Sequence, residues 1–294
     1  MSKENLITPK FLSKLETLQM LSRKILTGTM KGERKSSKRG KSVEFADHRN
    51  YVYGDEIKTI DWNIYGRLDK LFVKLFSEEE ELTFYILVDR SLSMDFGNPS
   101  KMEVAGKIAA ALSYIALYNY DRVSVGIFDS LLEGFQPPVR GKQQIFTIFD
   151  LLKKLEPRGQ TSLSKAIHHF CSRKFRPGMV IIISDFLDYS DFSRALRMLS
   201  FNKNDLFLIQ VLDGFELNPE IGGDIKFVDV ESGEVKELTV TDQLLDLYKN
   251  TIDEYCSNLR SLANKMGAGY IMAPTTVPFE DLVLQYLRKG ALIK

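Results

Sequence analysis

Two stretches of the sequence place a carboxylate directly after a strongly apolar run. Residues 82–94 read L-T-F-Y-I-L-V-D-R-S-L-S-M, so Asp89, Ser91 and Ser93 bring one carboxylate and two hydroxyls to alternate positions. Residues 179–185 read M-V-I-I-I-S-D and end in Asp185. Short oxygen-bearing side chains of this kind can bind a hard divalent cation, cap a helix or stabilise a turn. The elements that position them decide between these uses.

Apolar strands alternate with amphipathic helices from residue 82 to the end of the chain. The predicted strands are 82–88, 122–128, 131–136, 179–184, 206–212, a hairpin across 224–240, and 269–272; the predicted helices are 101–119, 143–154, 163–173, 191–200, 242–266 and 279–289. This alternation predicts an α/β fold: a doubly wound, mostly parallel sheet with helices on both faces and one antiparallel edge strand. Ligands of such sheets bind at the carboxyl ends of the strands, where Asp89 and Asp185 are expected.

An N-terminal extension over residues 1–80 precedes this domain, which is assigned to residues 81–294. The extension is predicted to contain an amphipathic helix at 9–26, a basic loop at 31–41 and a strand at 71–76. Residues 43–70 are interpreted as irregular. They are too rich in aromatic side chains for a disordered linker and should therefore pack against something.

Charged and aromatic residues of the extension are candidate partner-binding residues: Arg49, Tyr51, Asp55, Asp61, Trp62 and Arg67. In one interpretation, the two aspartates pair with Arg49 and Arg67 and lock the segment against the sheet, because buried charges require partners. In the other, the segment faces a partner protein, with Trp62 as an aromatic anchor.

Composition argues against recruitment by a global charge. The chain has 294 residues, 44% hydrophobic and 27% charged, and a net charge of +1, so binding to nucleic acid is not expected. The basic loop 31–41 could still contact phosphates or an acidic protein. The N-terminus lacks an apolar leader, no run approaches the ~20 apolar residues that span a bilayer, and the two cysteines read as buried thiols. A cytoplasmic protein without a transmembrane segment is expected.

Three enzyme classes are disfavoured because the sequence lacks their partner residues. A haloacid-dehalogenase-type phosphatase needs a second aspartate two residues after the first, where this chain has Ser91. An α/β-hydrolase needs a G-x-S-x-G elbow, and none occurs. A phosphate-binding loop needs G-x-x-x-x-G-K-[ST], and Gly40-Lys41-Ser42 matches only its end.

A divalent cation held by hydroxyls and carboxylates agrees better with these residue types. Mg²⁺ prefers an octahedron of oxygen ligands and retains water readily, and Mn²⁺ or Ca²⁺ could take its place. A site of this composition offers no evident base or nucleophile, so it would bind rather than catalyse. The simpler alternative is that the aspartates cap helices and the serines belong to turns.

The segment D-R-S-L-S-M after an apolar strand resembles the metal-ion-dependent adhesion site of von Willebrand factor type A domains. That motif has three parts: D-x-S-x-S, a threonine in a later loop and an aspartate at a subsequent strand end. The matching residues here are Asp89, Ser91, Ser93, Thr161 in P-R-G-Q-T-S-L, and Asp185. The resemblance covers about residues 81–290 and implies a bound Mg²⁺ that coordinates an acidic side chain of a partner.

The preceding segment resembles a bacterial family called Domain of Unknown Function 58. The similar residues are Arg49, Tyr51, Gly54, Asp55, Ile60, Asp61, Trp62 and Arg67, together with S-V-E-F at 42–45 and D-V-E-S-G-E at 229–234. Tyr53 stands where proline is common, and Lys58 where arginine is usual. The resemblance implies a non-enzymatic adaptor of a MoxR-type AAA+ ATPase in protein maturation or remodelling. The alternative is a metal-dependent hydrolase that uses a metal-bound water.

Overall fold

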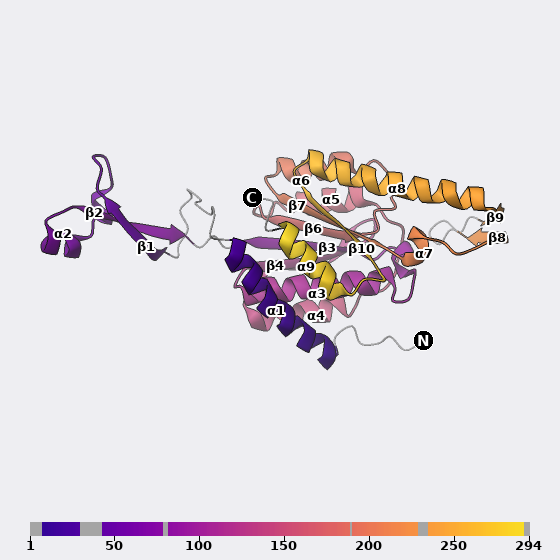
Figure 1. Ribbon diagram of the computed structural model, residues 1–294, viewed down its shortest axis with the longest axis horizontal. Helices are drawn as coiled ribbons and strands as arrows, with labels where there is room; N and C mark the ends of the chain where they lie inside the picture. Colours follow the sequence, from indigo (N-terminus) through magenta and orange to yellow (C-terminus); the bar gives the residue numbers. More distant parts are fainter. Residues whose placement is uncertain (1–7, 30–42, 79–81, 189, 229–234, 291–294) are drawn as a thin grey trace. The chain divides into compact units, whose positions relative to one another are not determined.

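The computed structural model describes residues 8–29, 43–78, 82–188, 190–228 and 235–290 (Figure 1). The chain forms two compact units, one made of residues 1–29 and 82–294 and the other of residues 30–81. The basic loop 31–41 and the whole D-V-E-S-G-E stretch at 229–234 fall outside the described residues.

A mostly parallel six-stranded sheet forms the centre of the larger unit. Its spatial order is β10 (Gly269–Pro274), β7 (Asp205–Leu212), β6 (Met179–Ser184), β3 (Thr83–Asp89), β4 (Arg122–Phe128) and β5 (Leu132–Arg140). All neighbours pair in parallel except β4 and β5, which form an antiparallel hairpin at the edge. The predicted mixed α/β class, with its parallel centre and antiparallel edge strand, is confirmed.

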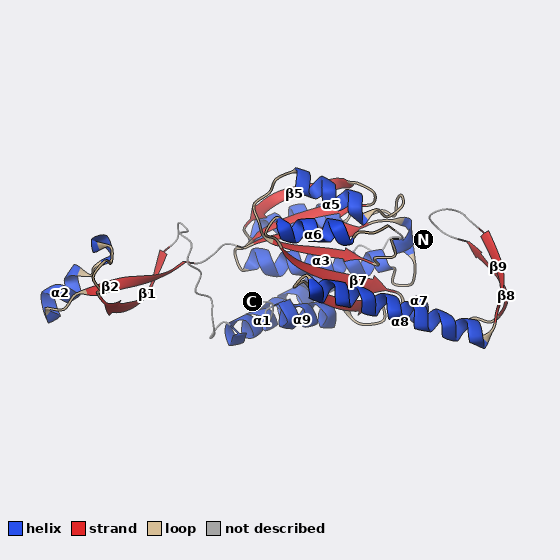
Figure 2. Ribbon diagram, turned by 90° about the horizontal axis from the view of Figure 1, so that it is seen from above, coloured by secondary structure: helices blue, strands red, loops and turns tan. Residues whose placement is uncertain are grey.

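Helices cover both faces of this sheet (Figures 1 and 2). One apolar core joins the sheet to α1 (Pro9–Thr29), α3 (Lys101–Tyr118), α4 (Ile145–Leu152) and α9 (Phe279–Gly290). A second core on the opposite face joins it to α5 (Leu163–Ser172), α6 (Ser193–Phe201) and α8 (Asp242–Lys265). The central strands are buried on both faces, which explains why their sequences are continuously apolar rather than alternating.

Helix α1 packs with the larger unit. Phe11, Leu15 and Leu18 lie on one stripe of the helix and are buried, and the helix contacts α3 and α9. The sequence-based division at residue 80 groups this helix with the extension. In the structure, its apolar stripe completes one of the two cores of the sheet domain instead.

The smaller unit contains more regular structure than its sequence indicates. Strand β1 (Val43–Asn50) pairs antiparallel with β2 (Phe72–Glu78), and between them lie a short 3-10 turn, η1 (Ile57–Thr59), and helix α2 (Trp62–Leu68). The strand predicted at 71–76 is present, whereas the irregular assignment of 43–50 was wrong. Its charged sequence has weak strand preference, and the pairing with β2 supplies what the local pattern lacks.

The described part of the larger unit also contains short elements outside the central sheet. These are 3-10 turns η2 (Leu92–Asp95) and η3 (Lys142–Gln144), helix α7 (Gly214–Leu217) and the hairpin of β8 (Gly223–Val228) with β9 (Val235–Val240). Among the described residues, no helix combines the length and apolar character required to cross a membrane. The expected cytoplasmic location stays a prediction.

Candidate metal site

The two strands that lead into Asp89 and Asp185 are neighbours in the sheet. They lie at the point where the order in which the chain adds strands reverses. After β3 the chain adds β4 and β5 on one side, and then returns to place β6 on the other side of β3. Asp89 ends β3, and Asp185 directly follows β6. Side chains at such a switch point share the crevice outside the carboxyl ends of the strands. The structure therefore brings the two predicted carboxylates to one place.

Asp89 is fully buried and accepts hydrogen bonds on both oxygens. The Ser91 backbone N–H donates to Oδ1 at 2.9 Å, and the Ser184 hydroxyl donates to Oδ2 at 2.6 Å. Burial, together with the nearby charge of Asp185, raises the pKa of Asp89 to about 7, although these hydrogen bonds act in the opposite direction. Removal from water makes ionisation of Asp89 costly unless a cation is close.

The hydroxyls of Ser91 and Ser93 lie together beside this carboxylate. Their Oγ atoms are 3.0 Å apart, at the beginning of η2. Adjacent oxygens around an octahedral Mg²⁺ with bonds of 2.0–2.1 Å are separated by about 2.9 Å. The two hydroxyls hydrogen-bond to each other at this distance, and the same spacing would let them act as neighbouring ligands of one small cation.

The loop that carries Thr161 is bonded to the loop after β3. Arg158 N–H donates to the Arg90 carbonyl at 2.8 Å, and Leu92 N–H donates to the Gly159 carbonyl at 3.1 Å. Thr161 follows directly and is half-buried. These backbone contacts place the predicted threonine loop beside the D-x-S-x-S segment.

The side chain of Asp185 is also fully buried, and its partners differ from those of Asp89. Leu187 N–H donates to Oδ1 at 3.1 Å, and the ammonium of Lys101 donates to Oδ2 at 2.8 Å. The same ammonium lies 2.6 Å from Glu216 Oε1. Sequence reasoning missed both of these residues. Lys101 reads as an ordinary surface residue at the start of a helix, and no local pattern marks it as buried.

Phe186 holds the backbone after Asp185 in an unusual conformation. Its φ is +60°, in the left-handed region where a bulky side chain is strained, and the side chain is fully buried. Its N–H donates to Ser184 Oγ at 2.9 Å, and the Tyr255 hydroxyl of α8 donates to its carbonyl. Strand β6 and helix α8 thereby fix the direction in which Asp185 leaves the sheet.

Arg90, within the D-x-S-x-S segment, ties the site to the edge hairpin. Its guanidinium donates to Asp129 Oδ2 at 2.9 Å and also contacts Glu133. Asp129 lies just after β4, and its carbonyl accepts from Ser162 N–H at 3.2 Å. The loops after β3 and β4 and the threonine loop therefore form one hydrogen-bonded rim.

The donor set is suited to a hard divalent cation. Within the described residues, no group of three or more His, Cys, Asp or Glu side chains is arranged to hold a metal ion. The candidate site instead combines two carboxylates with three hydroxyls, which is the oxygen-rich composition that Mg²⁺ accepts when water completes its shell. A cation would also favour the ionised form of buried Asp89. Asp89, Ser91, Ser93, Thr161 and Asp185 are the residues that would hold it.

The candidate partner-binding residues lie in the smaller unit, where ion pairs organise the turn between its strands. Arg49 donates to both oxygens of Asp55 at 2.6 and 2.7 Å, in agreement with the expected pairing. Asp61 caps α2 and contacts His48 at 3.0 Å and Lys74 at 3.3 Å. The hydrogen bond from His48 is the main cause that lowers the pKa of Asp61, to about 2. Arg67 was the second arginine expected to pair with an aspartate of this segment. In the structure, the ion-pair partners of Asp61 are His48 and Lys74.

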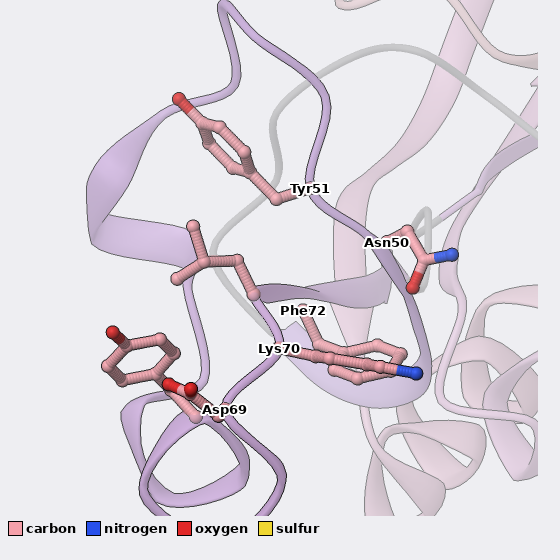
Figure 3. A pocket seen from close by; sticks show the side chains of 7 residues that line it. Asn50, Tyr51, Asp69, Lys70 and Phe72 are labelled. Atoms are coloured by element: carbon pink, nitrogen blue, oxygen red, sulfur yellow. The ribbon is translucent and has the colours of Figure 1, made fainter.

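Aromatic side chains are exposed next to this turn. Trp62 is 57% exposed, and its ring meets that of Tyr65 edge-on at 6.0 Å. Tyr51 and Tyr65 belong to an open hollow of about 570 Å³, whose other lining residues are Asn50, Asp69, Lys70, Leu71 and Phe72 (Figure 3). Exposed apolar groups around a hollow are typical of interaction surfaces. The partner-binding role of these residues stays a prediction.

The sequence matches the family profile described as protein of unknown function DUF58 over residues 47–254. Uncharacterised proteins from Mycobacterium tuberculosis and Mycobacterium bovis are 26% identical over 292 residues, covering 97% of this chain and 92% of each relative. The match therefore extends through both compact units.

Two solved structures match part of this chain at low sequence identity. A conserved hypothetical protein BatB from Bacteroides thetaiotaomicron is 12% identical, with a TM-score of 0.46 and coverage of 72% of this chain and 98% of that chain. An aerotolerance-related membrane protein from Bacteroides fragilis is 17% identical, with a TM-score of 0.47 and coverage of 71% and 99%. No functional conclusion follows from either similarity.

Proposed function

The chain belongs to the DUF58 family, and we propose that it is a non-enzymatic protein-interaction module that binds a divalent cation at the crevice between β3 and β6. The observation that carries this proposal is the convergence of Asp89, Asp185 and the paired hydroxyls of Ser91 and Ser93 at one switch point. The Mg²⁺ would supply an electrophilic position for a carboxylate of a partner protein.

The arrangement of the protein residues supports binding over catalysis. Both oxygens of Asp89 accept hydrogen bonds from Ser91 and Ser184, so this carboxylate is held as a fixed acceptor. No histidine is among the residues whose contacts define the site, and a metal-dependent hydrolase would need a base that can take a proton from water. The hydrolase therefore stays the second candidate.

The proposed partner class rests on the resemblance to von Willebrand factor type A domains and on the expectation attached to the DUF58 resemblance. In this proposal the acidic group belongs to a MoxR-type AAA+ ATPase or its client, and the module acts as an adaptor in protein maturation or remodelling. The exposed Trp62 and the hollow beside Tyr51 would provide a second contact surface.

Metal binding by the isolated protein tests the proposal directly. Titration calorimetry with Mg²⁺ and with Mn²⁺ should show binding by the wild type that is lost in Asp89→Ala, because the variant removes a buried ligand. Asp150→Ala is the matched control, since Asp150 is an exposed residue that pairs only with the exposed Lys153 in the described contacts. Equal binding by Asp89→Ala and Asp150→Ala would contradict the proposal.

Recovery of the partner is the second arm of this experiment. A MoxR-type ATPase from the same genome should be retained by the wild type in Mg²⁺ and released by a chelator, and Asp89→Ala should not retain it. Hydrolysis of a generic phosphoester that disappears in Asp89→Ala would instead favour the hydrolase.

A further inference from the structure

Lys101 is a charged residue that the protein keeps completely out of solvent. It is the first residue of α3, directly after the N-cap Ser100, and its side chain has no exposed surface. Lysine is almost never fully buried unless its ammonium is paired. Here the ammonium lies between two carboxylates, 2.8 Å from Asp185 Oδ2 and 2.6 Å from Glu216 Oε1.

Glu216 is fixed independently of Lys101. It belongs to α7, where its Oε2 accepts from Asp213 N–H at 2.8 Å as part of a capping box. The Asp213 side chain accepts from Phe215 N–H at 2.9 Å and from the Thr275 hydroxyl at 2.6 Å. The ammonium therefore joins three anchored elements: the start of α3, the end of β6 and α7.

The ammonium shares Asp185 with the candidate metal site. Asp185 Oδ2 faces Lys101, and Oδ1 is held by Leu187 N–H, so the carboxylate has one fixed orientation. The Asp89 carboxylate accepts only from hydroxyl and backbone donors in the described contacts. Of the two aspartates, the one after β6 is thus already balanced by a cation that belongs to the chain.

We propose that Lys101 is a positioning and specificity-determining residue of the metal site, an internal counter-cation that orients Asp185 and lowers the affinity of the site for free divalent cations. This inference rests on the proposed function. A fixed positive charge a few ångströms from a divalent cation opposes its binding, and even with the strong screening of bulk water such a repulsion changes an affinity by roughly tenfold or more.

The net charge of the metal-loaded site determines how strongly it repels a carboxylate of a partner. The carboxylates of Asp89, Asp185 and Glu216, the ammonium of Lys101 and a divalent cation sum to zero, whereas without the ammonium the loaded site would be negative. A neutral loaded site repels an incoming carboxylate less than a negative one does. Lys101 therefore lowers the affinity of the site for the free cation and favours binding of an acidic partner group to the loaded site.

Calorimetric titration with Mn²⁺ alone tests this role. Lys101→Met keeps most of the length of the side chain and removes its charge, and should bind Mn²⁺ at least roughly tenfold more tightly than the wild type. Glu216→Gln removes one of the two carboxylates that balance the ammonium, so that Asp185 alone pairs with it. This variant should bind Mn²⁺ a few-fold more weakly than the wild type. Lys107→Met is the matched control on the same helix, because its ammonium pairs with the partly exposed Glu103, and it should match the wild type.

Lys101→Met leaves two buried carboxylates without their partner and could prevent folding. The same substitution is therefore also tested in the Glu216→Gln variant, which has one buried carboxylate fewer. The double variant Lys101→Met/Glu216→Gln removes one charge of each sign and should bind Mn²⁺ at least roughly tenfold more tightly than Glu216→Gln alone. Circular dichroism verifies that each variant is folded. Unchanged or weaker Mn²⁺ binding on removal of Lys101 from the folded protein, in either background, would overturn the inference.

The outcome also separates this inference from the proposed function. If the wild type binds Mn²⁺, Asp89→Ala does not, and Lys101→Met matches the wild type, then only the role of Lys101 is wrong. If the wild type does not bind Mn²⁺ at all, the metal site itself is wrong and the inference falls with it.

Discussion

Asp89 experiences two sets of opposing influences. Burial and the neighbouring Asp185 disfavour its charged form, while hydrogen bonds from Ser184 and Ser91 favour it. The first set is stronger, so the pKa rises from 3.8 to about 7. Between these two values, the folded protein holds a proton on Asp89 that the unfolded chain has released.

The free energy of unfolding of the metal-free protein should consequently fall as the pH rises from about 4 to about 7, by at most a few kcal/mol. The sign follows from the raised pKa: the contribution is fully present below the unfolded value and is lost as the pH passes the folded value. Urea unfolding in a chelator at several pH values measures this slope. Asp89→Asn, which cannot titrate, should reduce it, and an equal slope in wild type and variant would refute the assignment.

At the scale of single elements, α1 belongs to the core of the sheet domain. Leu15 is fully buried against this core, whereas Met20 on the same helix is 66% exposed. Leu15→Ala removes buried methyl groups and leaves a cavity, so it should lower the free energy of unfolding by about 2–5 kcal/mol. Chemical denaturation followed by circular dichroism measures the change.

Met20→Ala is the control for this prediction and should change stability by less than about 0.5 kcal/mol, because an exposed side chain loses little packing. A cost for Leu15→Ala as small as that of the control would mean that α1 is dispensable to the domain. Such a result would favour the sequence-based grouping of this helix with the N-terminal extension.

The strength of the sequence signal differed from element to element for physical reasons. Strands β3 and β6 are buried on both faces, so their apolar runs identify them without any partner. Strand β1 has no such run, and its pairing with β2 is a tertiary contact that local sequence does not encode.

The same reasoning explains which site residues could be predicted from the sequence and which could not. Asp89 and Asp185 follow recognisable strands, whereas Lys101 and Glu216 meet through α3 and α7, which are far apart along the chain.

At the scale of the molecule, the two compact units differ in how much core they contain. The larger unit has two extensive apolar clusters, one on each face of its sheet. Among residues 48–74 of the smaller unit, the part in which side-chain burial is described, the buried residues are Ile60, Asp61 and Val73. An isolated two-stranded ribbon is only marginally stable by itself.

Hydrogen exchange followed by mass spectrometry should therefore separate the two units. Amides of β1 and β2 should exchange through local opening at a low free-energy cost, because few buried contacts are lost when the ribbon opens. Amides of β3 and β6 should exchange only near the cost of global unfolding, because both faces of these strands are covered. Arg49→Gln, which breaks the paired hydrogen bonds to Asp55, should speed exchange in β1 and leave β3 unchanged. Equal protection of β1 and β3 would show that the smaller unit is stabilised by contacts beyond its own core.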